Sequence, residues 1–129
     1  MAERVELIIT CLPSPAVCAT VMESEDGIIA GLSEGKIWLE MSTTDDSEVI
    51  RLAKRVEAKG AMAMDCPVSG GCHRAATGNI SILAGGNRET FDRVLPVLTA
   101  MGRRILHTGP IGSASVLKVV TNYLCTVHR

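Results

Sequence analysis

Short apolar runs that alternate with helix-like segments constrain this chain more than any other feature. The runs are strand-length and lie at residues 5–12, 36–41, 61–66, 79–84 and 104–108. Segments with apolar residues at helical spacing lie between most of them. Alternation of this kind is typical of a mostly parallel sheet flanked by helices, with right-handed crossovers. The sequence therefore predicts a single α/β domain.

Capping residues mark the predicted helices. Asp45, followed three positions later by Glu48, resembles a capping box, and Gly60 is suited to ending that helix. Asn87 is suited to capping a second helix, which carries one apolar stripe. A last helix is expected to run over residues 112–129.

Charge and hydropathy exclude two classes of partner. The chain has 13 basic and 14 acidic residues, a net charge of -1, and no basic run longer than Arg103-Arg104. We therefore expect no nucleic-acid binding. The start of the chain lacks a signal-peptide pattern, and no apolar run approaches the roughly 18 residues that a membrane span needs. A cytoplasmic protein without membrane contact is expected.

The cysteines and histidines indicate neither disulfides nor a metal. The five cysteines are an odd number, and none forms a C-x-x-C pair with another. Free thiols in a reducing compartment are expected. The three histidines are scattered, so we predict no metal site.

The last helix carries a polar stripe on an otherwise apolar surface. Ser115, Lys118 and Asn122 stand at positions i, i+3 and i+7, which places them on one side of the helix. A lysine held against apolar surroundings loses hydration, which favours its neutral form and suits it to proton transfer. The alternative is the solvent-facing stripe of a half-buried helix, because lysine commonly extends to water. Residue spacing leaves both interpretations open.

Loops that follow predicted strands are the candidate ligand sites, because ligands of open parallel sheets bind at the carboxyl ends of strands. Ser69-Gly70-Gly71 can present a hydroxyl and backbone N–H groups to an anion, or form an ordinary tight turn. Residues 109–114 fit neither G-x-G-x-x-G nor the Walker pattern. By spacing alone, Ser42-Thr43 are helix-entry residues and Leu12-Pro13 end a strand.

Several ordered motifs together resemble the β-hydroxyacid dehydrogenase family, which includes 3-hydroxyisobutyrate dehydrogenases and, as larger relatives, 6-phosphogluconate dehydrogenases. The resemblance covers essentially the whole chain. It implies a Rossmann-type NAD- or NADP-binding domain, joined by one long helix to an all-helical domain. It also implies hydride transfer between the cofactor and C3 of a small hydroxyacid. The motifs are TCLP at 10–13, EMST at 40–43, DCPVSGG at 65–71, AGG at 84–86, LTAMG at 98–102 and GPIGSASVLKVVTN at 109–122.

The resemblance also implies roles for individual residues. Lys118 would transfer the proton, and Asn122 would hold substrate and lysine in line. Three residues would bind the substrate carboxylate: Ser69, Gly70 and Gly71. Four would lie on the cofactor side: Leu12, Pro13, Ser42 and Thr43.

The chain departs from the family pattern in its cofactor loop. The family opens with a strand and G-x-G-x-x-G, and this sequence contains no such motif. The resemblance therefore implies a chain truncated at both ends, in which the first βαβ unit is missing. Residues 1–111 would be the later part of the dinucleotide-binding domain, and residues 112–129 the start of the interdomain helix. Without the pyrophosphate contacts, we expect these 129 residues alone to be inactive.

Two single positions also depart from the pattern. Ala114 stands at the third glycine of the family's last motif, where an added methyl group is expected to crowd the backbone against a ligand. Arg74 stands where relatives generally have a small residue. With His73 it would either tune the charge of the substrate pocket or face solvent.

Three functional hypotheses follow. The first is an oxidoreductase of the 3-hydroxyacid dehydrogenase type, homo-oligomeric in its full-length form. The second is a non-catalytic binding module of the same fold, which uses exposed sheet edges and helix faces for a partner chain. The third is an anion-binding domain that uses the glycine loops alone, without nicotinamide.

Overall fold

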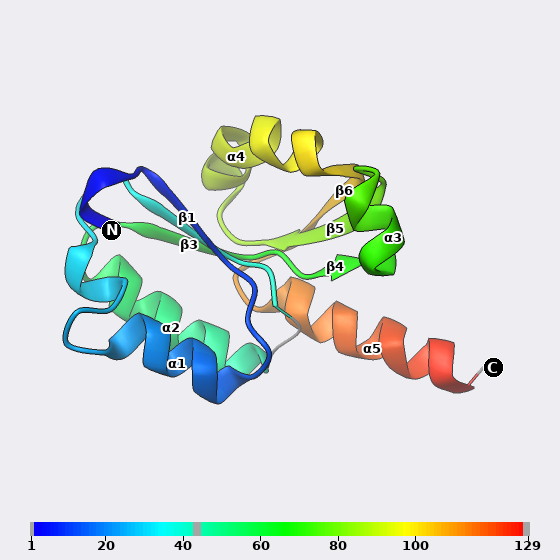
Figure 1. Cartoon of the computed structure of the whole chain (residues 1–129), viewed down its shortest axis with the longest axis horizontal. Helices are drawn as coiled ribbons and strands as arrows, with labels where there is room; N and C mark the ends of the chain where they lie inside the picture. The colour runs from blue at the N-terminus through cyan, green and yellow to red at the C-terminus, as the bar shows by residue number, and fades with distance from the viewer. Residues whose placement is uncertain (1, 43–44, 128–129) are drawn as a thin grey trace.

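The computed structural model describes residues 2–42 and 45–127, and these form one α/β unit built on a single sheet (Figure 1). The sheet order is β1-β2-β3-β5-β4, and β6 pairs with β5. This confirms the predicted sheet with flanking helices. The strands are β1 (Leu7–Thr10), β2 (Ile37–Glu40), β3 (Met62–Asp65), β4 (Val68–Ser69), β5 (Ile80–Gly85) and β6 (Gly102–Gly109).

Helices cover both faces of the sheet. In Figure 1, α4 lies above the sheet and α1, α2 and α5 lie below it. The predicted N-caps are present: the Asp45 side chain accepts from Ser47 N–H, and Asn87 accepts from Glu89 N–H. Glu48, expected to complete a capping box, instead pairs with Arg51, and the C-cap of α2 is Ala58, two residues before Gly60. The helices are η1 (Ala2–Arg4), α1 (Pro15–Glu23), η2 (Ile29–Gly31), α2 (Asp46–Glu57), α3 (Gly71–Ala76), α4 (Arg88–Met101) and α5 (Ser113–Val127).

The strand pairing is parallel in three contacts and antiparallel in two. The pairs β1–β2, β2–β3 and β5–β6 are parallel, whereas β5 runs antiparallel to β3 and β4. The connection between β4 and β5 contains only the short helix α3, and a parallel crossover needs a dozen or more residues. The chain therefore turns back at α3, and β4, β5 and α3 lie beyond the ends of β1 and β2 (Figure 1).

The segment after Cys66 differs from the predicted loop. Val68 and Ser69 form β4, paired with Ile82 and Ser81 of β5, and Gly71 begins α3. The carbonyl of Pro67 accepts from Leu83 N–H, which keeps this segment in register with β5. A proline without an N–H still supplies an acceptor at a sheet edge, so Pro67 does not end the pairing.

Strand β1, predicted from the apolar run at residues 5–12, is buried on one face and partly exposed on the other. Ile8 is buried among α1 and α2, whereas Ile9 is 42% exposed. On that face α4 packs mainly over β3, β5 and β6, so Leu7 still packs against the cluster beneath α4 but Ile9 remains partly exposed.

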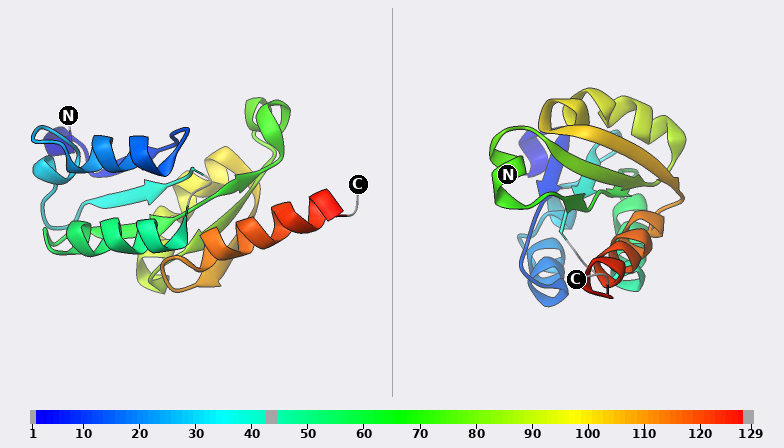
Figure 2. Two further views of the ribbon diagram at one scale, coloured as in Figure 1. Left: turned by 90° about the horizontal axis from the view of Figure 1, so that it is seen from below. Right: turned by 90° about the vertical axis from the view of Figure 1, so that its right-hand side faces the viewer.

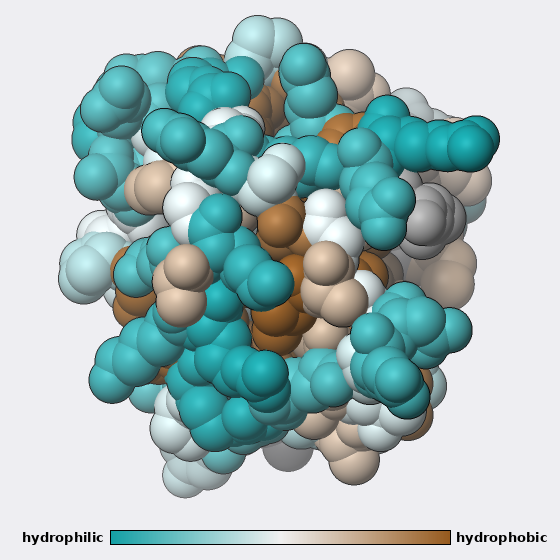
Figure 3. All heavy atoms as spheres, turned by 90° about the vertical axis from the view of Figure 1, so that its left-hand side faces the viewer, coloured by the Kyte–Doolittle hydropathy of each residue, from teal (hydrophilic) through white to brown (hydrophobic). Residues whose placement is uncertain are grey.

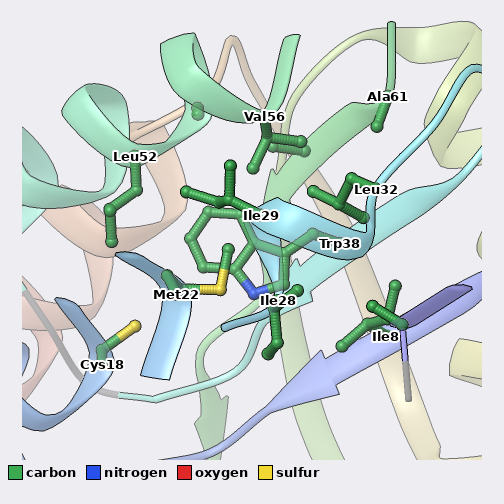
Figure 4. Packing of buried hydrophobic residues seen from close by; sticks show 13 residues of the cluster. Ile8, Cys18, Met22, Ile28, Ile29, Leu32, Trp38, Leu52, Val56 and Ala61 are labelled. Atoms are coloured by element: carbon green, nitrogen blue, oxygen red, sulfur yellow. The ribbon is translucent and has the colours of Figure 1, made fainter. Parts of the chain in front are cut away.

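Two apolar clusters fill the space between the sheet and the helices. Trp38 lies in the middle of the first, between the sheet and α1 and α2, where Met22 and Leu52 pack around its ring (Figure 4). Its indole N–H donates to Thr10 Oγ1 at 2.9 Å, which satisfies the buried polar atom. Leu39, the next residue along β2, belongs to the second cluster, beneath α4. The two clusters thus pack the helices against both faces of the sheet.

The side of the molecule opposite α3 is mostly hydrophilic around its rim, and apolar side chains gather near its centre (Figure 3). Among the described residues, no helix combines the length and the hydropathy that crossing a bilayer requires. The chemistry-bearing residues lie toward the other end of the sheet.

The reactivity of the cysteine thiols tests whether the two apolar clusters are closed to solvent. Cys18 and Cys66 are buried, one in each cluster, whereas Cys11 and Cys72 are exposed. Burial raises the pKa of Cys66 to about 12, and burial together with the neighbouring carboxylate of Glu40 raises the pKa of Cys18. We expect iodoacetamide at pH 8 to modify Cys11 and Cys72 and to spare Cys18 and Cys66, as measured by peptide mass spectrometry.

The raised thiol pKa values also set a pH dependence of stability. In the unfolded chain these thiols ionise near the ordinary value of about 8.5, while the folded protein retains their protons. Their contribution is therefore complete below that pH, and stability falls as the pH rises above it. Rapid alkylation of Cys18 and Cys66 without denaturant would contradict this packing.

Candidate active site

The first turn of α5 is held by a carboxylate from a distant part of the chain. Asp65, the last residue of β3, accepts from Gly112 N–H at 2.8 Å with one oxygen. Its other oxygen accepts from Ser115 N–H at 2.8 Å and from Ser115 Oγ at 2.9 Å. These backbone groups have no partner within the helix, and the helix dipole adds favourable electrostatics. Asp65 thus fixes the position of α5 against the sheet.

The Asp65 carboxylate is fully buried. Burial raises its pKa, and the hydrogen bonds from Gly112 and Ser115 act in the opposite direction. A Cβ atom on Gly85 would lie 2.3 Å from Asp65 Oδ1. The glycine at this position therefore gives the carboxylate the room that it occupies.

Lys118 lies on the side of α5 that faces the domain. It is only 8% exposed, and its Nζ donates to Ser69 Oγ at 2.9 Å. Ser115, one turn earlier, is also buried. The alternative of a solvent-facing stripe is therefore wrong for Ser115 and Lys118. Asn122, one turn further along, is exposed.

The outer side of α5 is apolar and exposed, which inverts the usual arrangement of a surface helix. Figure 2 shows α5 reaching beyond the sheet. The exposed side chains are Val116, Val119, Val120, Tyr123 and Leu124.

The loop residues predicted to bind the substrate carboxylate begin at Ser69. Ser69 is the last residue of β4, and Gly70 follows with a φ of 125°, a conformation that L side chains rarely adopt. Gly71 then begins α3. The structure therefore brings Ser69 to Lys118 and places the two glycines directly after it.

The two cofactor-side loops are joined by a hydrogen bond. Leu12 N–H, after β1, donates to Ser42 Oγ, after β2, at 2.6 Å. Ser42 is buried, Leu12 is half-buried and Pro13 is exposed. The predicted Thr43 lies outside the described residues. Leu12 and Ser42 thus form one continuous wall at the ends of neighbouring strands.

A second buried carboxylate supports this wall. Glu40, the last residue of β2, is fully buried and accepts from Ser42 N–H at 2.8 Å. Its other oxygen accepts from Cys18 Sγ at 2.6 Å. Glu40 is also the register partner of Asp65 on β3. Two neighbouring strands therefore end in buried acids that each bind the backbone of a following segment.

The remaining sequence-based expectation concerns Ala114. It is fully buried inside the first turn of α5, so its methyl group contacts protein atoms. The expected crowding of a ligand near this methyl group stays a prediction. Among the described residues, no group of three or more His, Cys, Asp or Glu is placed to hold a metal ion.

Sequence reasoning assigned no role to Asp65 or Glu40. Both stand at the end of an apolar strand, where a charged residue is rarely buried without partners. Their position at the end of an apolar strand was the one sequence feature that indicated buried, hydrogen-bonded carboxylates. The partners of Asp65 lie about fifty residues away, so the sequence did not identify them.

Comparison with known proteins agrees with this arrangement. A family model described as the NAD binding domain of 6-phosphogluconate dehydrogenase matches residues 1–109. The chain belongs to this family.

Similar members of the family include dehydrogenases of small hydroxyacids. The mitochondrial 3-hydroxyisobutyrate dehydrogenase of Rattus norvegicus is 36% identical over 127 residues, which are 98% of this chain and 38% of the relative. The 2-(hydroxymethyl)glutarate dehydrogenase of Eubacterium barkeri is 32% identical over 124 residues, which are 96% of this chain and 41% of the relative. The predicted β-hydroxyacid dehydrogenase family is thereby confirmed, and the chain spans about 40% of these relatives' length.

A solved structure of the same family shares the fold. The structure of Mycobacterium tuberculosis 3-hydroxyisobutyrate dehydrogenase with L-serine superposes with a TM-score of 0.92 at 27% identity. The match covers 98% of this chain and 42% of that protein. The chain thus has the Rossmann-like, mostly parallel sheet of an NAD(P)-binding domain of this family.

Substitution of Asp65 tests its role at α5. In Asp65→Asn, the side-chain N–H₂ replaces an acceptor and faces the donors of Ser115. We expect the free energy of unfolding, measured by urea denaturation, to fall by about 1 to 3 kcal/mol. Hydrogen exchange at Gly112 and Ser115 should accelerate.

The matched control is Asp92→Asn, which removes an exposed carboxylate that pairs with Arg88 on α4. Its effect should stay within about 0.5 kcal/mol. Equal stabilities of the two variants would show that Asp65 does not hold α5.

Proposed function

We propose that this chain carries the proton-transfer residue and the nicotinamide side of an NAD(P)-dependent dehydrogenase of small 3-hydroxy carboxylates. The observation that carries the proposal is the buried Lys118 with its Nζ 2.9 Å from Ser69 Oγ. A lysine amine held at hydrogen-bonding distance from a polar loop can exchange a proton with a molecule bound at that loop.

Ser69 and the two glycines after it are the proposed site of the substrate carboxylate. The Ser69 hydroxyl can donate to that carboxylate, and Gly70 after it has a φ of 125°, a conformation that L side chains rarely adopt. A carboxylate bound here lies beside Lys118, whose Nζ is 2.9 Å from Ser69 Oγ. The substrate hydroxyl is then within reach of Nζ.

In the direction of oxidation, the neutral amine of Lys118 takes the proton of the substrate hydroxyl as the carbonyl forms. The hydrogen on the same carbon leaves as a hydride. Bound NAD or NADP would accept that hydride. In the reverse direction Lys118 returns its proton to the carbonyl oxygen. Asn122, one turn beyond Lys118, is proposed to hold the substrate and the amine in line.

The cofactor would be held on its nicotinamide side by the wall of Leu12, Pro13, Ser42 and Thr43. The hydrogen bond from Leu12 N–H to Ser42 Oγ supports this, because it fixes the two loops as one surface at the ends of β1 and β2. The buried Glu40 carboxylate accepts a hydrogen bond from Ser42 N–H and so fixes the Ser42 backbone. The described part of this wall presents an apolar side chain and a hydroxyl that is already hydrogen-bonded, so it fits the flat face of a planar ring.

The division into a dinucleotide-binding part over residues 1–111 and an interdomain helix from residue 112 is also proposed. The exposed apolar side of α5 supports it, because such a surface is expected where a helical domain packs. The same surface supports the second candidate, a non-catalytic module that binds a partner chain through α5. The same surface could also form the contact between two copies of this chain in a homo-oligomer.

Substitution of Lys118 separates these candidates. The protein is produced over the natural boundaries of its gene, and reduction of NAD and NADP is measured with a panel of 3-hydroxyacids. We expect Lys118→Ala to lower kcat by about 10²- to 10⁴-fold, the usual contribution of a positioned acid–base group. Lys118→Arg should fail as well, because arginine keeps its proton.

The matched control is Lys59→Ala, which removes an exposed lysine after α2. It should retain the activity of the unmodified protein. Full activity in Lys118→Arg would reject Lys118 as the proton-transfer residue. A folded protein with no turnover of any panel member would favour the binding module.

A further inference from the structure

A basic pocket lies at the end of the sheet formed by α3, β5 and the start of β6. Its lining includes His73 and Arg74 from α3, Ser81 from β5, and Arg103 and Arg104 from β6. Its described lining contains no Asp or Glu. Several cationic groups therefore surround one hollow in a chain whose net charge is -1.

The arginines of this pocket have no anionic partner among the described residues. By contrast, Arg51, Arg55 and Arg88 elsewhere in the chain each pair with a carboxylate. Like charges gathered without counter-charges repel one another, and a bound anion relieves that repulsion. The pocket is therefore electrostatically suited to an anion.

The register of the sheet places this pocket beside the candidate active site. Ser69 is paired with Ser81, and Ser81 with Arg104, so the three residues form one row across β4, β5 and β6. Paired residues point to the same face, and adjacent strands lie about 4.8 Å apart. Ser69 is the residue that Lys118 contacts. The Arg104 backbone is thus roughly 10 Å from that of Ser69, on the same face.

Arg74 connects the pocket to the glycine loop directly. A Cβ atom on Gly70 would lie 2.9 Å from Arg74 Cδ, so the arginine stem packs over that glycine. The two alternatives for Arg74 in the sequence were a role in substrate charge and a solvent-facing position. Its side chain is exposed, but it lines the pocket and borders the proposed carboxylate loop.

We propose that this pocket binds a second anionic group of the substrate, a carboxylate, sulfonate or phosphate distal to the carboxylate held at Ser69. Guanidinium groups bind all three in bidentate geometry. The substrate class is then a dianionic hydroxyacid. This inference rests on the proposed function, because it takes Ser69 and Lys118 as the site of the reacting end.

A small dianion fits the pocket better than a nucleic acid does. Nucleic-acid binding uses an extended basic surface and aromatic side chains that stack on bases. Here the basic residues gather in one hollow, and aromatic residues are 2% of the chain. The anion is therefore expected to be a single group on a small molecule.

The first arm of the test measures binding without catalysis. Inorganic phosphate is titrated by calorimetry, at constant ionic strength, into the protein produced over its natural gene boundaries. Saturable binding is expected, and Arg74→Gln and Arg104→Gln should each weaken it about tenfold or more. The control Arg93→Gln, an exposed arginine on α4, should bind as the unmodified protein does. Equal binding by all four proteins, or tighter binding of an oligonucleotide than of phosphate, would overturn the inference.

The second arm measures substrate preference. Two 3-hydroxyacids of equal length are compared, one with a neutral distal end and one with a distal carboxylate. We expect kcat/KM to favour the dianion by about tenfold or more, and this ratio to fall in Arg74→Gln and Arg104→Gln but not in Arg93→Gln. Turnover that depends on Lys118 without preference for the dianion would overturn this inference and leave the proposed function standing. Absence of turnover with both acids would overturn the proposed function, and this substrate assignment with it.

Discussion

The buried carboxylate of Asp65 binds the first turn of α5, and the position of Lys118 depends on that contact. A helix that begins at the end of a sheet has free N–H groups, and Asp65 supplies acceptors for them from β3. Once the start of α5 is fixed, helical geometry determines which residues face the sheet. Ser115 and Lys118 face inward, so a lysine side chain is buried while valines on the same helix are exposed.

A second buried carboxylate, that of Glu40, stabilises the loop proposed to contact the cofactor in the same way. Glu40 ends β2 as Asp65 ends β3, and the two residues are register partners. Each carboxylate accepts a backbone N–H from the segment that follows or packs on its strand. Burying a charge is costly unless hydrogen bonds satisfy it, so these acids restrict the loops to one arrangement. A rigid edge of this kind is what hydride and proton transfer between two bound molecules require.

Much of the architecture could be predicted, because strands and helices leave local patterns. The caps at Asp45 and Asn87 and the alternation of elements are examples. The antiparallel turn through α3 could not, since chain direction in a sheet depends on contacts that no local pattern encodes. The stripe of Ser115, Lys118 and Asn122 was evident from spacing, but spacing did not show that the first two are buried and the third exposed. The contact that holds Ser115 comes from Asp65, far away in sequence. The roles of Lys118 and Ser69 came from family resemblance.

The most direct measurement of the central claim is a crystal structure of the protein, produced over its natural gene boundaries, with cofactor and a 3-hydroxy carboxylate bound. The account predicts the carboxylate at Ser69 and the substrate hydroxyl within about 3.2 Å of Lys118 Nζ, the reach of a proton transfer. A substrate bound away from Ser69, or a Lys118 side chain turned to solvent in the complex, would contradict it.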